Sequence, residues 1–203
     1  MTGIDQQLIT GLILAGGRGT RMGQVDKGLQ NFRGAPMALH ALMRLSPQVG
    51  EIIINANQNL AVYESFGTQV WPDQIEGFAG PLAGVQTGLQ HCETPYMLTV
   101  PCDSPLLPEN LCACLSSALL NDDADLALAV TLEQEYGITR RQTHPVFALM
   151  KSSILPSLTD FLQQGGRKVD AWFQHLRITE VVFEDSNGFR NINTLQELRQ
   201  FEC

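Results

Sequence analysis

The sequence predicts an α/β fold: a single three-layer αβα domain with a largely parallel sheet between two layers of helices. Two observations predict it. Short runs of Ile, Leu and Val alternate with segments of helical periodicity, and these runs are continuously apolar, as in strands buried on both faces. With 203 residues, 44% of them hydrophobic, the chain can bury a full core, so residues 1–203 are expected to form one domain.

The alternation is most regular in the first two thirds of the chain. A Gly-rich stretch ends the first short strand, Leu12 to Ala15. Pro36 then stands at a first helical turn, a position that tolerates its missing N–H. The expected strands are 12–15, 51–55, 69–71, 96–100 and 126–131, and the expected helices are 36–45, 60–66, 82–91 and 109–120.

The last third is less regular. It predicts strands at 146–150 and 178–183, and helices at 154–164, at 169–176 and from Thr194. Loops are expected at 16–34, 72–81, 101–108 and 133–143. The first three loops follow strands, and ligands of open parallel sheets bind beyond the carboxyl ends of the strands. We therefore expect these three loops to meet at a binding site.

Charge and cysteine usage exclude several classes of protein. The net charge is −8, whereas binding to nucleic acid or to a membrane surface requires clustered Lys and Arg. The five cysteines form no C-x-x-C pair, so neither a disulfide framework nor a zinc site is indicated. The N-terminal segment lacks the features of a signal peptide, and no apolar run is long enough for a membrane span. We expect a cytoplasmic protein.

The stretch LILAGGRGTRMGQVDKG, residues 12–28, places glycines and cations directly after the first strand. It is not a Walker loop, and it departs from the dinucleotide fingerprint because Met22 stands where the third glycine belongs. Backbone N–H groups of such a loop can cradle phosphate oxygens, while Arg21 and Lys27 add cationic contacts. The pattern favours binding of an anionic phosphate ligand over two solvated loop charges.

Asp103 follows the apolar strand YMLTV at its carboxyl end. Magnesium prefers one or two carboxylates together with phosphate oxygens, so a single aspartate beside a phosphate loop suits Mg²⁺. The alternative is an aspartate that caps a helix in a Pro-rich turn. The nearby phosphate loop favours the metal.

The loop resembles the signature of nucleotidyltransferases, Rossmann-like enzymes that join an NTP to a phosphate-bearing acceptor and release pyrophosphate. Within them, Arg21-Met22-Gly23 followed by Asp26-Lys27-Gly28 resembles the molybdenum cofactor guanylyltransferases, although Gly19-Thr20 is more typical of the sugar-phosphate branch. Further matches follow in order along nearly the whole chain: NAN at 55–57, Asp73, GPLAG at 80–84, PCDSP at 101–105, HPVFAL at 144–149 and NINT at 191–194.

The resemblance implies a role for each matching position. It implies that Arg21, Lys27 and Asp103 are catalytic and that Asp103 holds Mg²⁺. It places GTP against Leu14, Ala15, Gly16, Gly17, Arg21, Lys27, Asn55, Asp73 and Asp103. It places the pterin of the acceptor against Gly84, Asn191 and Asn193, so that the N-terminal half holds the nucleotide and the C-terminal half the pterin.

Residue chemistry leaves some of these roles open. Asp73 can accept the adjacent N1–H and N2–H₂ donors of guanine, or it can cap its loop. Asn55 fits a nucleotide contact or a simple turn, and Asn191 and Asn193 fit the acceptor or the N-cap region of the last helix. His144 is not expected to be a general base, because an acceptor phosphate is already ionised; a structural or acceptor-contact role is expected instead.

The implied reaction is Mg²⁺-dependent transfer of GMP from GTP to the phosphate of metal-loaded molybdopterin, with transient contacts to pterin-supplying proteins and molybdoenzymes. Two rivals share the loop: a cytidylyltransferase for the same pterin and a sugar-1-phosphate nucleotidyltransferase. From a different class, a catalytically silent GTP-binding pterin carrier would also fit, although a carrier does not require Arg21, Lys27 and Asp103 together.

Overall fold

The computed structural model describes residues 3–17, 26–75, 80–135 and 138–192. Among these residues, a seven-stranded sheet has the order β5-β4-β1-β6-β8-β7-β9, and a small hairpin pairs β2 with β3. The strands are β1 (Ile9–Leu14), β2 (Asn31–Phe32), β3 (Ala35–Pro36), β4 (Glu51–Asn55), β5 (Gln69–Trp71), β6 (Tyr96–Pro101), β7 (Leu126–Glu135), β8 (Ile138–Lys151) and β9 (Ile178–Phe183).

The strands of the large sheet run mostly in one direction. β1 pairs in parallel with β4 and β6, β4 pairs in parallel with β5, and β7 pairs in parallel with β9. Of the described strands in this sheet, β8 alone is antiparallel to its neighbours, β6 and β7. The expectation of a largely parallel α/β sheet is confirmed.

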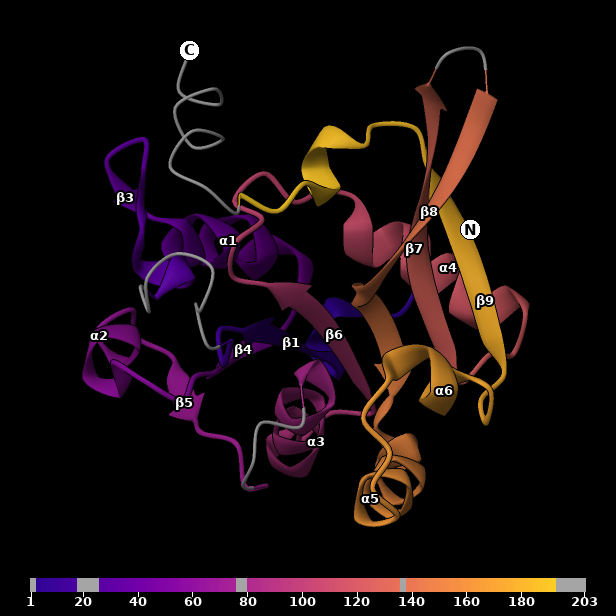
Figure 1. Cartoon of the computed structure of the whole chain (residues 1–203), viewed down its shortest axis with the longest axis horizontal. Helices are drawn as coiled ribbons and strands as arrows, with labels where there is room; N and C mark the ends of the chain where they lie inside the picture. Colours follow the sequence, from indigo (N-terminus) through magenta and orange to yellow (C-terminus); the bar gives the residue numbers. More distant parts are fainter. Residues whose placement is uncertain (1–2, 18–25, 76–79, 136–137, 193–203) are drawn as a thin grey trace.

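Helices cover both faces of the sheet (Figure 1). One core contains Ile9 and Ile13 of β1 with apolar side chains of α1 and α4, while the other contains Leu12 of β1 with those of α3, α5 and α6. Successive side chains of a strand point to opposite faces, so β1 contributes to both cores. The helices are α1 (Met37–Leu45), α2 (Leu60–Glu64), α3 (Pro81–His91), α4 (Leu111–Asn121), α5 (Leu155–Gln163) and α6 (Val169–Phe173), with short 3₁₀ helices at Gln6–Leu8, Lys27–Leu29, Ser46–Gln48, Ser152–Ile154 and Asn187–Phe189.

The expected loop at 133–143 was wrong. Most of it belongs to β7 and β8, which pair as one long hairpin that projects beyond the other strands in Figure 1. The sequence did not predict this strand because residues 139–144 are polar. The strand forms nevertheless, because it pairs with β7 in the hairpin. The β-branched residues Ile138, Thr139 and Thr143, which favour strands, were the available signal. The closing helix expected from Thr194 lies outside the described residues.

A register shift divides β8 into two parts. Leu128 of β7 pairs with Ala148, but the next residue, Ala129, pairs with His144, so residues 145–147 bulge out of the ladder. Pro145 has no N–H to donate to a sheet ladder, which explains why the irregularity falls there. The bulge begins where β8 stops pairing with β6, after the partners Thr99 and Ala148. The described residues contain no helix long and apolar enough to cross a membrane.

Candidate functional site

The site centres on an ion pair between two loops that are far apart in sequence. Lys27 Nζ lies 3.3 Å from Asp103 Oδ2. Lys27 lies in the phosphate-type loop, the Gly-rich segment 16–34 after β1, and Asp103 follows β6, the strand hydrogen-bonded beside β1. Because neighbouring parallel strands end at the same edge of the sheet, their loops meet there. The sequence-based expectation that these two residues belong to one site is consistent with this contact.

Asp103 is held in a restricted environment. The residue is 7% exposed, and its backbone carbonyl accepts a hydrogen bond from Ile192 N at 2.9 Å. Burial raises the pKa of the Asp103 carboxyl, and the nearby Lys27 ammonium lowers it in opposition. Cys102, the preceding residue, is also buried, and burial raises the pKa of its thiol. Cys102 is therefore a packing residue and not a thiolate nucleophile.

A second polar cluster forms beyond the carboxyl ends of β4 and β5. The two oxygens of the Asp73 carboxylate accept hydrogen bonds from Asn55 Nδ2 at 2.9 Å and from Asn57 Nδ2 at 2.8 Å. Asn57 also accepts from the Asp73 backbone N–H and donates to the Gly16 carbonyl. The sequence matched Asn55 and Asp73 to nucleotide contacts, but it gave Asn57 no role of its own. The network fixes Asp73 against the start of the phosphate-type loop.

Two glycines allow this cluster to pack closely. A Cβ atom on Gly16 would lie 2.8 Å from Asn57 Nδ2, and one on Gly84 would overlap Asn55 Oδ1 and lie 2.6 Å from Leu14 Cδ2. Gly84 is buried within α3. Close helix packing therefore accounts for the absence of a side chain at Gly84, a reason that the sequence motif did not supply.

The remaining predicted site residues differ in where they lie. Leu14 and Ala15 continue the strand contacts of β1, since Cys102 N donates to the Leu14 carbonyl and Ala15 N to the Asn55 carbonyl. Gly17 is exposed at the point where the described segment ends. Arg21 lies outside the described residues, as does Asn193 on the acceptor side.

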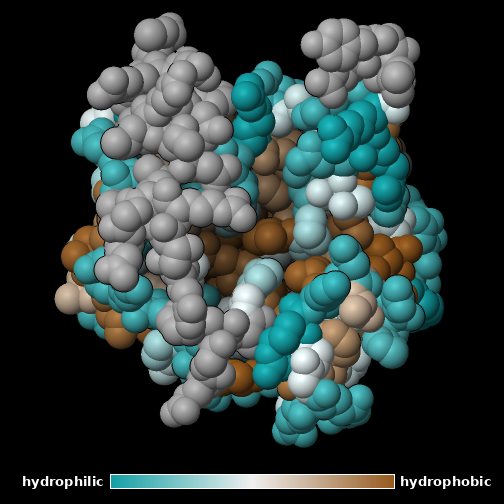
Figure 2. Space-filling model, viewed as in Figure 1, coloured by the Kyte–Doolittle hydropathy of each residue, from teal (hydrophilic) through white to brown (hydrophobic). Residues whose placement is uncertain are grey.

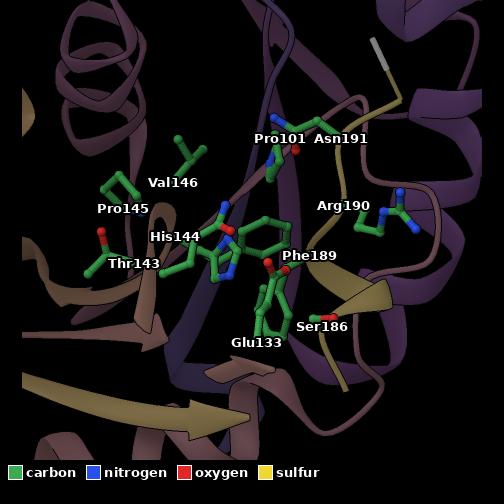
Figure 3. Close-up of a pocket in the computed structure, with 12 residues that line it drawn as sticks. Pro101, Glu133, Thr143, His144, Pro145, Val146, Ser186, Phe189, Arg190 and Asn191 are labelled. Carbon is green, nitrogen blue, oxygen red and sulfur yellow. The ribbon is translucent and has the colours of Figure 1, made fainter. Parts of the chain in front are cut away.

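A cavity of about 400 Å³ opens at the end of β6, two residues before Asp103 in the chain (Figure 3). Pro101 at the end of β6, His144 of β8, and Asn191 line it from three parts of the chain. Asn191 accepts a hydrogen bond from Ser104 Oγ at 2.8 Å, which ties the C-terminal segment to the Asp103 loop. The cavity lies where the bulge separates β8 from β6, and Figure 2 shows a hollow with hydrophobic side chains on its floor on this face.

His144 contributes packing to this cavity. Its ring stacks on Phe189 at 4.7 Å between centroids, and Nε2 lies 2.8 Å from Thr131 Oγ1. Burial lowers the pKa of His144, although the charge of Glu133 acts in the opposite direction. These contacts favour the structural or acceptor-contact role expected from sequence. The lining residues Glu133, Gln142 and Thr143 were missed because they fell in the expected loop.

The cluster Gly165-Gly166-Arg167-Lys168 directly follows α5 and its C-cap residue. Gly165 has a positive φ of 87°, and Gly166 N donates to the Phe161 carbonyl, as in a glycine-terminated helix. Arg167 donates to the Leu162 carbonyl. Capping of α5 thus explains three of these residues.

The donor set limits the kind of metal that could bind. Among the described residues, no group of three or more His, Cys, Asp and Glu side chains could hold a metal ion. A structural zinc site requires such a group, whereas Mg²⁺ is held by one or two carboxylates with phosphate oxygens. Asp103 beside the phosphate-type loop fits the second arrangement.

Comparison with known proteins gives close relatives over nearly the whole chain. Residues 11–178 match the MobA-like NTP transferase domain. The chain is 62% identical over 193 residues to a molybdenum cofactor guanylyltransferase of Ralstonia nicotianae, with 95% of each chain covered. It is 56% identical over 197 residues to the protein of that name in Bordetella petrii, covering 97% of this chain and 98% of that one.

Solved structures of more distant proteins share the fold. Molybdopterin-guanine dinucleotide biosynthesis protein A of Archaeoglobus fulgidus has a TM-score of 0.76 at 20% identity, covering 95% of this chain and 96% of that one. The 4-diphosphocytidyl-2C-methyl-D-erythritol synthase of Anaerococcus prevotii also has a TM-score of 0.76, at 14% identity and with 98% of each chain covered. At such identities the likeness concerns the fold alone.

Proposed function

Because this chain belongs to the molybdenum cofactor guanylyltransferases, within the MobA-like NTP transferase family, we propose that the Lys27–Asp103 pair is its reaction centre. The chain is accordingly an enzyme, a GTP-dependent guanylyltransferase of molybdenum cofactor biosynthesis. The observation that carries the site proposal is the 3.3 Å contact between two charged residues separated by 76 positions. A silent pterin carrier would not require this arrangement.

The reaction exchanges one phosphoanhydride for another. An oxygen of the molybdopterin phosphate attacks the α-phosphorus of GTP and forms the new P–O–P bond. The bond from the α-phosphorus to the bridging oxygen breaks, and pyrophosphate leaves with its electrons. The attacking phosphate is already ionised, so the protein has no proton to remove. Its tasks are alignment of the two phosphates and stabilisation of the charge that develops on pyrophosphate.

Lys27 and Asp103 suit these tasks because each neutralises the other in the absence of ligands. The Lys27 ammonium is positioned to bind the triphosphate, with Arg21 as a second cation of the same loop. Asp103 then keeps its negative charge for a metal ion. Loss of one such electrostatic group typically costs about 10²- to 10³-fold in rate.

A divalent metal ion is typical of GTP-using nucleotidyltransferases, and we assign Mg²⁺ to Asp103. The single buried carboxylate, with phosphate oxygens supplied by the nucleotide, suits the preference of Mg²⁺ for few protein ligands. When bound, the ion would neutralise negative charge on the triphosphate. Burial raises the pKa of Asp103 even beside Lys27, so a bound metal ion would further favour its ionised form.

The nucleotide is proposed to lie along the carboxyl ends of β1, β4 and β5. Leu14, Ala15, Gly16 and Gly17 would present backbone groups to it, while Asn55 and Asp73 would contact the nucleoside. Each Asp73 oxygen accepts one amide hydrogen and keeps a further lone pair, so the carboxylate can still accept the N1–H and N2–H₂ donors of guanine. Adenine lacks this pair of donors.

Molybdopterin is proposed to occupy the cavity lined by Pro101, His144 and Asn191. The cavity lies on the far side of Asp103 from β4 and β5, which places the two substrates on opposite sides of the reaction centre. Asn191, with Asn193 two residues later in the sequence, would contact the acceptor. We assign Gly84, which the resemblance places at the pterin, to the GTP side instead, because it packs against Asn55 and Leu14. The N-terminal half thus binds GTP and the C-terminal half binds the pterin.

The cellular setting stays a prediction. Since the reaction consumes GTP, a nucleotide of the cytoplasm, we expect the protein to act there. Transient contacts with the protein that supplies molybdopterin and with molybdoenzymes are expected, because the cofactor would otherwise be exposed to solvent between steps.

The test is anaerobic pyrophosphate release by the purified protein with Mg²⁺, metal-loaded molybdopterin and GTP, CTP, ATP or UTP. We expect release with GTP alone and a fall of about 10²- to 10³-fold in Asp103→Asn. Asp170→Asn is the control, because Asp170 is an exposed aspartate of α6, a helix that carries none of the proposed site residues. Release with CTP would overturn the role given to Asp73, and a wild-type rate in Asp103→Asn would remove Asp103 from the metal site.

A further inference from the structure

Asp26, the residue immediately before Lys27, is held by two side chains at α2. Tyr63 donates its hydroxyl hydrogen to Asp26 Oδ1 at 2.6 Å, and Asn59 Nδ2 donates to Asp26 Oδ2 at 3.0 Å. Tyr63 is fully buried. A buried hydrogen bond to an ionised acceptor is stronger and shorter than one between neutral groups. The loop that carries Lys27 is therefore fastened to a helix outside the proposed substrate sites.

The same hydroxyl also limits the residue that follows Lys27. A Cβ atom on Gly28 would overlap Tyr63 Oη and lie 3.1 Å from Cys102 Sγ. Gly28 thus passes between Tyr63 and the residue that precedes Asp103. Tyr63 therefore contacts the chain on both sides of Lys27: it donates a hydrogen bond to Asp26 and packs against Gly28. The geometry leaves little freedom for the backbone of Lys27 relative to Asp103.

The Asp26 backbone carbonyl is fixed as well. It accepts from Leu29 N at 3.3 Å and from Gln30 Nε2 at 3.2 Å, which closes the 3₁₀ turn Lys27–Leu29. Burial raises the pKa of Tyr63, so the phenol keeps its proton and remains a hydrogen-bond donor. The effect of the hydroxyl on Lys27 passes through the backbone on either side, at Asp26 and at Gly28.

We propose that Tyr63 is a positioning residue for guanylyl transfer, which acts through Asp26 to hold Lys27 opposite Asp103. The inference rests on the proposed phosphate-binding role of Lys27. A lysine side chain is long and flexible, and displacement of a charged group by about 1 Å can cost about 10²-fold in rate. A rigid backbone under Lys27 reduces this loss by restricting where the ammonium can lie before GTP binds.

The test is a double-mutant cycle between Tyr63→Phe and Lys27→Ala, measured as kcat/KM for GTP in anaerobic pyrophosphate release. Tyr63→Phe removes only the hydroxyl, and we expect a loss of about tenfold to a hundredfold. In the Lys27→Ala background, the same change should cost less than about twofold, because the group that Tyr63 positions is gone. Tyr96→Phe, a tyrosine at the start of β6, is the matched control and should keep wild-type kcat/KM.

The outcomes separate this inference from the proposed function. Equal losses from Tyr63→Phe in both backgrounds would mean that Tyr63 supports the fold in general, which overturns the inference. Wild-type kcat/KM in Lys27→Ala would instead overturn the phosphate role of Lys27. If thermal unfolding shows that Tyr63→Phe does not fold, Asn59→Gly takes its place in the cycle. It removes the other donor to Asp26, and glycine accepts the positive φ of 52° at that position.

Discussion

Gly84→Ala should weaken GTP binding although Gly84 acts on the proposed nucleotide site through its neighbours Asn55 and Leu14. The new methyl group would overlap Asn55 Oδ1 and lie 2.6 Å from Leu14 Cδ2. Asn55 is 2% exposed and donates to both the Trp71 carbonyl and Asp73 Oδ1. It has no open space into which to move, so the methyl group must displace Asn55 or push α3 away from the sheet.

The magnitude follows from two opposing contributions. Overpacking of a buried site costs about 1–3 kcal/mol, whereas alanine is favoured over glycine within a helix by about 1 kcal/mol. The expected net loss of unfolding free energy is about 1 kcal/mol, which lowers the Tm of a chain of this size by roughly 2–4 °C. Displacement of Asn55 should raise KM for GTP about tenfold, the equivalent of about 1.4 kcal/mol.

Gly88→Ala provides a matched control one turn later on the same helix. Its methyl group would overlap Leu12 Cδ2 and lie 3.0 Å from Met97 Sδ, which are core atoms with no polar partner in the site. It should lower the Tm by a similar amount and leave KM for GTP unchanged. Both variants are assayed by thermal unfolding and by initial rates of pyrophosphate release. If Gly84→Ala raised KM for molybdopterin and not for GTP, our reasoning would be refuted and Gly84 would belong to the acceptor site.

Two further predictions concern pH. Burial raises the pKa of Asp103 above its ordinary value of 3.8, and Lys27 opposes this shift. As the pH is lowered at subsaturating Mg²⁺, kcat/KM for GTP should therefore begin to fall before pH 3.8 is reached, and the fall should begin at a higher pH in Lys27→Ala. An unchanged or lower starting pH in that variant would contradict this prediction. Burial lowers the pKa of His144 from 6.5, so the unfolded chain binds more protons at this residue and its contribution to stability is lost as pH falls below about 6.5. Urea unfolding at pH 7 and pH 5.5 should show a smaller pH-dependent loss in His144→Gln than in the wild type, and equal losses would exclude this residue as a source.

Much of the fold could be predicted from the sequence because the signals for its elements are local. The strands at 51–55, 69–71 and 178–183 have the predicted bounds, and the other strands and helices predicted within the described residues are present with shifted ends. Hydrophobic periodicity and the positions of Gly and Pro are local signals that span a few residues. They predict an element without information about the elements that pack against it. The positive charge of the loop at 16–34 is likewise a local signal, and it predicts a phosphate ligand from the sequence alone.

Contacts between distant segments depended on the tertiary structure. The sheet order places Lys27 beside Asp103 and joins Asn57 to Asp73, and no local pattern specifies either distance. The N-terminal half of β8 was hidden because a polar strand is stabilised by its neighbour in the hairpin, and the acceptor cavity depends on the bulge in that strand. Sequence thus determined which chemical groups the chain carries and most of the elements it forms. Tertiary packing decided which of these groups meet, because their contacts depend on the order and register of strands far apart in the chain.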